Sequence, residues 1–390
     1  MLNFDFNIPT KIYFGQGRIE VLGKEILKYG KKILLAYGGG SIKKNGIYDE
    51  VVSQLKASKI EFVELSGIKP NPSIESVREG VKLCKENDVE FILAVGGGSV
   101  IDCAKAIAAG ANYAGDAWDF FVKGAKVDNV IAIGSILTLS ATGSEMNANT
   151  VISNEATEEK LPFAHPTLKP RFSILDPTYT YSVSAVQTAA GTADIMSHCL
   201  EQYFSKVDGT FVQDRMTEAI LKTCIQYGPI AMKEPDNYEA RANLMWASSL
   251  ALNGLLQYGK EGDWATHVME HKISAISDLT HGIGLAILTP HWMAEVLDKS
   301  SLEKFHSFAT NVFHISEGND QMEMVNAGIQ ALKEFFISLN IPSNLYDLGI
   351  RITEDRFHEM AVDIVKNGPI GKYKSLGLSE VLSILKSCYR

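Results

Sequence analysis

Short apolar runs alternate with amphipathic stretches in the first half of the chain. The apolar runs cover residues 32–37, 60–65, 90–95, 130–136 and 171–176, and several are rich in Ile and Val. Continuous apolar runs are typical of parallel strands that are covered on both faces. Between the second and third runs, "NPSIESVREGVKLCKENDV" predicts a helix with Ser73 as its N-cap. The order strand, helix, strand predicts a parallel α/β sheet.

Helical patterns replace the strands in the second half. "NYEARANLMWASSLALNGLLQYG" (237–259), "QMEMVNAGIQALKEFFISLN" (321–340) and the closing "GLSEVLSILKSC" each predict a helix. The second of these ends before Ile341-Pro342, a helix-stop signal. Because 390 residues exceed one ordinary core, the pattern predicts an α/β domain at 1–184 and an all-helical domain at 185–390.

Two similar glycine turns follow predicted strands. They are "AYGGGSIKKNG" (36–46) and "AVGGGSVIDCAKA" (94–106), and a third, hydroxyl-rich turn is "TLSATGSEMN" (138–147). Glycine lets the backbone approach a ligand closely, and the N-terminus of a helix favours a phosphate. The G-x-G-x-x-G fingerprint is absent, and the glycines could simply make tight strand-to-helix turns. Their repetition favours a cofactor that contains phosphate.

Acidic and histidine side chains recur at helical spacing in the second half. "GTADIMSHCLE" (191–201) places Asp194 and His198 four residues apart, and His267, His271 and His281 follow within "WATHVMEHKISAISDLTHGIGLA". Residues i and i+4 share one face of a helix, as metal ligands on helices require. A carboxylate with imidazoles suits Fe²⁺, Zn²⁺ or a similar ion. This set predicts a metal site in which the bound ion stabilises an alkoxide.

Composition narrows the function classes. The net charge of −9 argues against binding to nucleic acid and to anionic membranes. No apolar run reaches the roughly 20 residues of a membrane span. The N-terminus lacks the pattern of a signal peptide, and the five cysteines form no CxxC pair. We therefore expect a reduced, cytoplasmic protein.

One motif points to a different chemistry. "HVMEH" (267–271) fits H-x-x-E-H, a metallopeptidase pattern in which Glu270 would be the general base. That interpretation leaves the glycine turns and the Asp194–His198 pair without a role. A metallohydrolase is therefore kept as a remote alternative, and a catalytically silent nucleotide-binding protein as a second one.

Taken together, the motifs resemble the iron-containing (group III) alcohol dehydrogenase family, in particular its butanol dehydrogenase branch. The resemblance runs over nearly the whole chain, from "IPTKIYFGQG" through "GIKPNPSIESV", "LAVGGGSVIDCAKAIAAGANY" and "FSILDPTYTYS" to "ARANLMWASSLALNGLL" and "HGIGLAILTPHWM". It implies a Rossmann-like N-terminal domain and an all-α C-terminal domain, the dehydroquinate synthase-like fold, with a deep cleft between the domains. It also implies a homodimer.

The resemblance assigns roles to individual residues. The metal ligands would be Asp194, His198, His267 and His281, and His271 would lie beside the nicotinamide and the substrate. The four ligands and His271 together form the predicted catalytic group. The pyrophosphate turn would be Gly96, Gly97, Gly98 and Ser99 with Asp102, and the remaining dinucleotide residues would be Gly38, Gly39, Ser41, Thr138, Thr142, Ser144, Asn147, Lys160 and Tyr179.

Two positions depart from the family pattern. Ser184 stands where a proline is usual, which would loosen a domain hinge. The turn Gly38 to Ser41 lacks the acid that holds the adenosine ribose in NAD-specific relatives, and Lys43 and Lys44 follow it. The absence of this acid removes repulsion against a 2′-phosphate, so we expect NADP(H) to be accepted beside NAD(H).

The resemblance implies a reaction class. We expect an NAD(P)H-linked alcohol dehydrogenase or aldehyde reductase that interconverts short-chain primary alcohols, such as butanol, and their aldehydes with Fe²⁺ or Zn²⁺. A polyol dehydrogenase of the same fold is the nearer alternative. The apolar residues Phe163, Leu255, Leu256 and Trp264 favour an unbranched aliphatic substrate.

Overall fold

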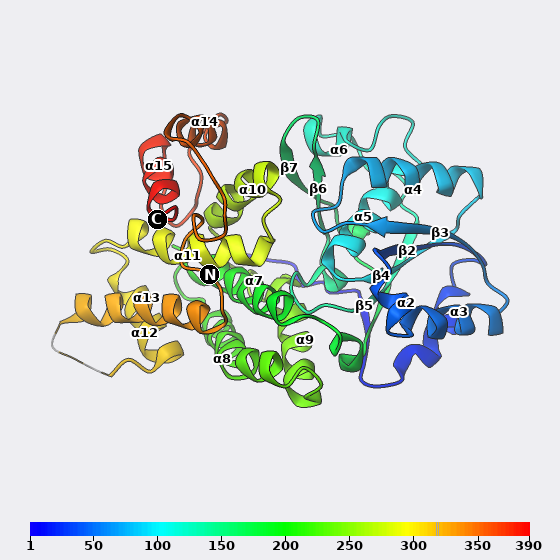
Figure 1. Ribbon diagram of the computed structural model, residues 1–390, viewed down its shortest axis with the longest axis horizontal. Coiled ribbons are helices and arrows are strands. Elements are labelled where there is room, and N and C mark those ends of the chain that lie inside the picture. Colours follow the sequence, from blue (N-terminus) through cyan, green and yellow to red (C-terminus); the bar gives the residue numbers. More distant parts are fainter. Residues whose placement is uncertain (317, 319) are drawn as a thin grey trace. The chain divides into compact units, whose positions relative to one another are not determined.

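The five predicted strands belong to one parallel sheet in the computed structural model of the protein (Figure 1). The sheet has six strands in the order β1-β8-β5-β4-β2-β3. Their bounds are β1 (Lys11–Phe14), β2 (Lys32–Gly38), β3 (Glu61–Ile68), β4 (Phe91–Gly96), β5 (Ala132–Leu137) and β8 (Phe172–Leu175). The edge strand β1 was not predicted, because it has only four residues and only Tyr13 among them is buried. The structure describes residues 1–316, 318 and 320–390.

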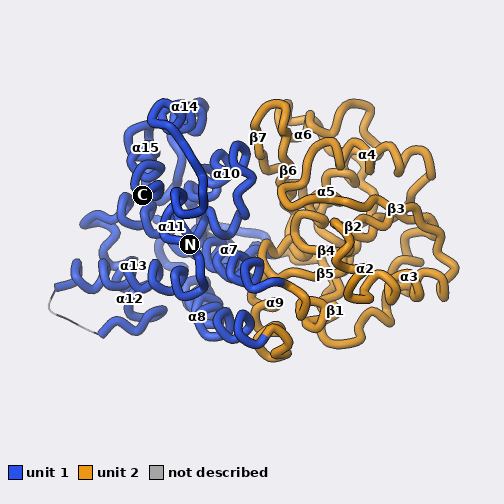
Figure 2. The backbone as a smooth tube through the Cα atoms, in the orientation of Figure 1, with its two compact units in different colours: residues 1–6, 184–234, 250–390 blue, residues 7–183, 235–249 orange. Residues whose placement is uncertain are grey.

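Contacts divide the chain into two units (Figure 2). The α/β unit consists of residues 7–183 and 235–249, and the helical unit of residues 1–6, 184–234 and 250–390. The predicted domains, 1–184 and 185–390, differ from these units mainly in the segments 1–6 and 235–249. Segment 235–249 groups with the α/β unit, where Met245 joins the core and Ser248 Oγ accepts a hydrogen bond from Ala141 N at 3.0 Å.

Helices cover both faces of the sheet. Alternate side chains of β2 and β4 pack against α4 and α5 on one face and against α1 and α3 on the other. Ser73 caps α4, as predicted, by accepting a hydrogen bond from Ser76 N at 3.3 Å. The helices of this unit are η1 (Arg18–Val21), α1 (Leu22–Ile26), α2 (Ser41–Lys44), α3 (Ile47–Ala57), α4 (Ile74–Glu86), α5 (Gly98–Gly110), α6 (Asp119–Val122), η2 (Ser144–Met146), η3 (Pro166–Leu168) and η4 (Pro177–Thr180).

An antiparallel hairpin, β6 (Asn149–Asn154) with β7 (Glu159–Ala164), interrupts the α/β pattern and was not predicted. It follows the turn after β5 and packs on α5 and α4. Its two strands have six residues each and mix polar with apolar residues, and β7 contains Pro162, which is unusual within a strand. The hairpin carries Lys160, one of the residues assigned to the dinucleotide.

The direction in which strands are added to the sheet reverses between β2 and β4. From β2 the chain passes outward to β3 and then returns to β4 on the other side of β2. Ligands of open α/β sheets bind outside the carboxyl ends of strands at such a reversal. The two glycine turns follow these two adjacent strands, so the topology places both turns at this point.

The helical unit is built from helices around α7, which contacts α8 and α11 most extensively. Its helices are α7 (Ala185–Tyr203), α8 (Phe211–Lys233), α10 (Ala265–Ser277), α11 (His281–Val296), α12 (Leu302–Phe313), α13 (Gln321–Ser338), α14 (Glu354–Ile364) and α15 (Leu378–Ser387); α9 (Tyr238–Leu252) lies mostly in the α/β unit. The predicted helices at 321–340 and 377–388 are confirmed. Among the described residues, no helix has the length and apolar character needed to cross a membrane.

Candidate active site

Helix α7 carries the first two candidate ligands on one buried face. Its N-terminus is capped by Ser184, whose Oγ accepts a hydrogen bond from Gln187 N at 3.3 Å. Asp194 and His198 are 2% and 4% exposed, and His198 Nε2 lies 3.6 Å from Asp194 Oδ1. Burial of a carboxylate is costly unless it is paired or binds a metal. Asp194 and His198, one helical turn apart, therefore lie side by side as predicted.

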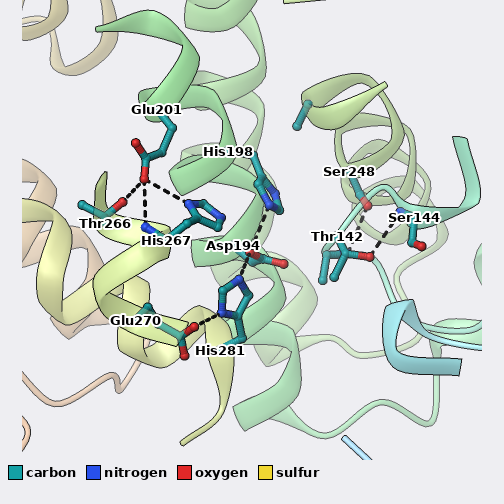
Figure 3. Close-up of polar contacts among 12 residues, drawn as sticks. Thr142, Ser144, Asp194, His198, Glu201, Ser248, Thr266, His267, Glu270 and His281 are labelled. Carbon is teal, nitrogen blue, oxygen red and sulfur yellow. Dashed lines mark hydrogen bonds and ion pairs between the residues drawn. The ribbon is translucent and has the colours of Figure 1, made fainter. Parts of the chain in front are cut away.

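Helices α10 and α11 bring two more histidines to the same point (Figure 3). His281 Nε2 lies 3.7 Å from Asp194 Oδ1, and the ring of His267 stacks on that of His198 at 4.9 Å. Single donor atoms of Asp194, His267 and His281 all lie within 4.8 Å of one another. His198 lies beside this group of three rather than within the same limit. The structure thus brings together the four residues assigned to the metal.

Buried carboxylates orient two of the imidazoles. Glu201 Oε1 lies 3.0 Å from Nδ1 of His267 and also accepts a hydrogen bond from the His267 backbone N at 3.1 Å. Glu270 Oε2 is bonded to Nδ1 of His281 (Figure 3). Because a carboxylate only accepts, Nδ1 of each ring carries the proton and Nε2 is left as an electron-pair donor. Both rings therefore direct a lone pair away from their carboxylates.

These residues fit a divalent metal ion. Among the described residues, Nε2 of His267 and Nδ1 of His198 are buried and have no hydrogen-bond partner. Burial, reinforced by His267, His281 and His271, lowers the pKa of His198 well below its ordinary value. His198 is therefore neutral, as a ligand must be. One carboxylate with imidazole nitrogens is a donor set for Fe²⁺ or Zn²⁺.

His271 occupies a different position from the other three histidines. It is partly exposed, and its ring centroid lies 5.4 Å from that of His281 and 6.3 Å from that of His267. It lies near Glu270 and His281, outside the group formed around Asp194. This position suits a side chain that acts on the substrate rather than one that binds the metal.

A glycine allows α11 to approach α7 beside the candidate metal ligands. A Cβ at Gly282 would lie 1.9 Å from the carbonyl oxygen of Ala190. Only glycine therefore permits this contact, which places the adjacent His281 opposite Asp194.

Gly282→Ala should move α11 away from α7 and separate His281 from Asp194. We expect an overpacking cost of about 1–3 kcal/mol in the free energy of unfolding. Metal affinity should fall about tenfold, the lower end of the effect of misoriented ligands. Denaturant unfolding and competition with a chelating dye would measure the two quantities; unchanged metal affinity would contradict this account of the glycine.

The two glycine turns lie at the carboxyl ends of β2 and β4. Gly38 ends β2, Gly39 lies in the following turn and Ser41 begins α2. Gly96 ends β4, Gly97 precedes α5 and Gly98 with Ser99 forms the first turn of α5. A Cβ at Gly98 would lie 2.3 Å from Thr142 Oγ1, so the hydroxyl-rich turn after β5 packs directly on the α5 N-terminus.

The turn after β5 is connected to α5 by polar contacts. Ser144 Oγ donates to Asp102 Oδ1 at 2.5 Å, and Ser144 N donates to Thr142 Oγ1 at 3.2 Å. Asn147 Nδ2 donates to the carbonyl oxygen of Thr142 at 3.3 Å. Asp102 Oδ2 accepts from Val151 N at 2.9 Å. The carboxylate of Asp102 is therefore engaged in holding the turn.

The other residues assigned to the dinucleotide are more dispersed. Thr138 follows β5, and its N donates to the Gly96 carbonyl oxygen at 3.1 Å. Lys160 is 8% exposed on β7. Tyr179 is buried with the opposite face of the sheet, and its hydroxyl donates to Glu50 Oε2 at 2.6 Å. Burial and Glu50 raise the pKa of the Tyr179 hydroxyl.

Sequence reasoning missed Glu201. The residue lies three positions after His198 and seven after Asp194, on the same helix face, within an apolar stretch. That spacing was the available signal. Glu270 was noticed only as a possible general base, whereas the structure shows it bonded to His281. The glutamate of the H-x-x-E-H match is therefore a carboxylate that orients His281, one of the candidate metal ligands.

Comparison with known protein families shows to which family the chain belongs. The profile described as "Iron-containing alcohol dehydrogenase" matches residues 9–177, and that of the "Fe-containing alcohol dehydrogenase family, C-terminal" matches residues 188–389. The chain belongs to the iron-containing alcohol dehydrogenase family. This assignment confirms the predicted family and fold, and it supports the alcohol dehydrogenase prediction over the metallohydrolase and silent-binding alternatives.

Full-length relatives of this family are similar to the chain. It is 54% identical to NADH-dependent butanol dehydrogenase A of Clostridium acetobutylicum, with 100% of both chains covered. It is 44% identical to an NADPH-dependent aldehyde reductase of Escherichia coli over 90% of each chain. The crystal structure of an NADH-dependent butanol dehydrogenase A from Thermotoga maritima superposes with a TM-score of 0.95 at 40% identity and covers 100% of this chain and 99% of that one.

Proposed function

We propose that the protein interconverts short-chain primary alcohols, such as butanol, and their aldehydes with NADH or NADPH. As a member of its family it is an NAD(P)-linked alcohol dehydrogenase or aldehyde reductase. The observation that carries the proposal is the buried cluster of Asp194 with three histidines, two of them oriented by carboxylates. The substrate class is supported by the full-length similarity to a butanol dehydrogenase.

The helical unit would hold the metal through Asp194, His198, His267 and His281. When bound, Fe²⁺ or Zn²⁺ supplies a Lewis acid for the carbonyl oxygen. Glu201 and Glu270 accept from Nδ1 of His267 and His281, which fixes the orientation of both rings and leaves Nε2 of each as the atom available to the metal. Asp194 is the only carboxylate among the four proposed ligands, so a divalent ion would retain a net positive charge.

The α/β unit would hold the dinucleotide at the turns after β2, β4 and β5. When bound, the nicotinamide ring donates or accepts the hydride. Backbone N–H groups of the first turn of α5, at Gly98 and Ser99, would bind the pyrophosphate. Thr138, Thr142, Ser144 and Asn147 border this turn, and Lys160 and Tyr179 complete the proposed set.

The proposed proton relay is His271. Its ring is partly exposed and lies beside His281, so it can exchange a proton with solvent while facing the metal ligands. His271→Ala should retain the metal and lower kcat about tenfold, because water can replace a relay that would otherwise contribute roughly 10²- to 10⁴-fold. Metal analysis and steady-state kinetics of the variant would measure both effects; loss of the metal would contradict the assignment.

Charged side chains near the first glycine turn bear on the choice of dinucleotide. Glu64 of β3 lies 3.6 Å from Lys43 Nζ and accepts a hydrogen bond from Tyr48 at 2.6 Å. Glu64 thus supplies, from the neighbouring strand, an acid that the turn itself lacks, while Lys43 balances its charge. This pairing supports acceptance of both NADH and NADPH.

An apolar aromatic side chain at the metal cluster supports an aliphatic substrate. The ring of Trp264 lies 5.2 Å from that of His267 and 6.4 Å from that of His198. Leu256 is fully buried, whereas Phe163 stacks on Phe120 within the α/β unit. Trp264 therefore borders the proposed site, and its apolar ring favours a monoalcohol over a polyol.

The function is tested by oxidation of NADH and of NADPH with butanal. The purified protein should turn over butanal, lose activity after chelation and regain it when Fe²⁺ or Zn²⁺ is added. The two nucleotides are ranked in the same assay, and glycerol with NAD⁺ or NADP⁺ serves as the polyol comparison. Metal-loaded protein that oxidises neither nucleotide would refute the proposal.

We also propose a cytoplasmic homodimer. The five cysteines are buried and free, which fits a reducing compartment. The edge strand β1 of the α/β unit has one side without a neighbouring strand in the described chain and could pair with a second copy. Light scattering should give twice the 42.7 kDa mass of one chain; a monomeric mass would refute the dimer.

A further inference from the structure

A lysine is completely buried beneath the turn after β5. Lys105 lies on α5 and is 0% exposed. Its side chain is among the largest fully buried ones in the described chain. Buried lysines are rare and require polar partners, so the contacts of this ammonium group identify what it does.

The three N–H donors of Lys105 all have acceptors, two in the turn after β5 and one at the start of β6. Nζ donates to Ser144 Oγ at 2.8 Å, to Asn147 Oδ1 at 3.0 Å and to the Asn149 carbonyl oxygen at 2.7 Å. An ammonium group has three donors and no acceptor. Lys105 therefore has no donor left for a ligand, which argues for a role that acts through its partners.

The partners of Lys105 are themselves linked to the dinucleotide turns. Ser144 donates onward to Asp102, and Asn147 Oδ1 also accepts from Asn149 N at 2.9 Å while its amide nitrogen donates to Thr142. Thr142 in turn packs on Gly98 at the start of α5. The ammonium group is thus the centre of a network that joins the two turns.

The charge of Lys105 is balanced within this network. Burial lowers its pKa to about 8, and the carboxylates of Asp102 and Glu145 oppose that shift. Glu145 is fully buried and is held by Ser249 Oγ at 2.5 Å. The protonated form supplies the third donor, so the network is complete only with the ammonium ion.

We propose that Lys105 is a positioning residue of the dinucleotide site. Lys105 holds Ser144 and Asn147, and with them the segment 138–149, in the geometry that binds the nucleotide. The proposal rests on the proposed function, because that function makes Ser144 and Asn147 part of the nucleotide site. The residue itself touches no ligand.

Lys105→Met tests the proposal because methionine is apolar and fills most of the space. The Kd of NADH and of NADPH is measured by energy transfer from tryptophan, and KM and kcat with butanal. We expect Kd and KM for the nucleotide to rise about tenfold or more, since each well-placed hydrogen bond contributes on the order of tenfold in affinity. The kcat at saturating nucleotide should change little.

Three further variants make the result specific. Cys103→Ala, at another fully buried position of α5, should leave Kd unchanged. In the double variant Lys105→Met with Ser144→Ala, the losses should not multiply, because Lys105 acts partly through Ser144. Lys105→Gln, which keeps a polar end, should give an intermediate Kd, and it decides the question if Lys105→Met does not fold.

The outcomes separate this proposal from the proposed function. A wild-type protein that binds nucleotide, with an equal Kd in Lys105→Met or Lys105→Gln, would overturn the role of Lys105 alone. A lower kcat at unchanged KM would also overturn it, because loss of folded protein has that signature. Absence of nucleotide binding by the wild-type protein would overturn both proposals.

Discussion

His267→Ala should lose the bound metal and lower kcat/KM for butanal by about 10³-fold or more, because a Lewis acid contributes several kcal/mol to the transition state. His267 is expected to have this effect because its Nε2 atom is buried without a hydrogen-bond partner while its Nδ1 atom is held by Glu201. Alanine removes the donor and leaves Glu201 without its imidazole partner. Metal analysis and steady-state kinetics would measure the two losses.

The matched control is His291→Asn. His291 lies on α11 and is partly buried, and burial lowers its pKa to about 4. The control should retain wild-type metal content and activity. Full activity of His267→Ala without bound metal would disprove the assigned ligand set.

Glu201→Leu should weaken metal binding by about 10- to 100-fold, the usual effect of removing a carboxylate that orients a ligating histidine. The substitution removes the acceptor for Nδ1 and for the backbone N of His267, and for the hydroxyl of Thr266. His267 would then be free to rotate or to protonate Nε2. Competition titration with a chelating dye measures the affinity, and thermal unfolding of the metal-free protein measures the structural cost.

Glu218→Gln is the control for burial of a carboxylate in the same unit. Glu218 is 3% exposed on α8 and accepts hydrogen bonds from Tyr203 at 2.7 Å and Asn311 at 3.2 Å. We expect this variant to be less stable with unchanged metal affinity. Equal effects of the two substitutions on metal affinity would show that Glu201 acts only through general stability.

The local sequence pattern was sufficient to predict features that depend on a single helix or strand. Short apolar runs predicted five strands of the sheet, and β2 and β4, which are covered on both faces, are apolar at nearly every position. The edge strand β1 and the β6–β7 hairpin were missed, because β1 has only four residues and both hairpin strands mix polar with apolar residues. The helix predicted at 237–259 ends at Leu252, and segment 235–249 groups with the α/β unit, which no local pattern encodes.

By itself, the sequence determined that Asp194 and His198 share a helix face, because the helical repeat follows from the backbone alone. It also placed the glycine turns after strands. Only the tertiary structure decided that α10 and α11 bring His267 and His281 to Asp194, that Glu201 and Glu270 orient them, and that Lys105 lies beneath the turn of Ser144 and Asn147. These contacts join residues that are distant in sequence. Their partners are selected by packing and by the need to satisfy buried polar groups, which no local spacing specifies.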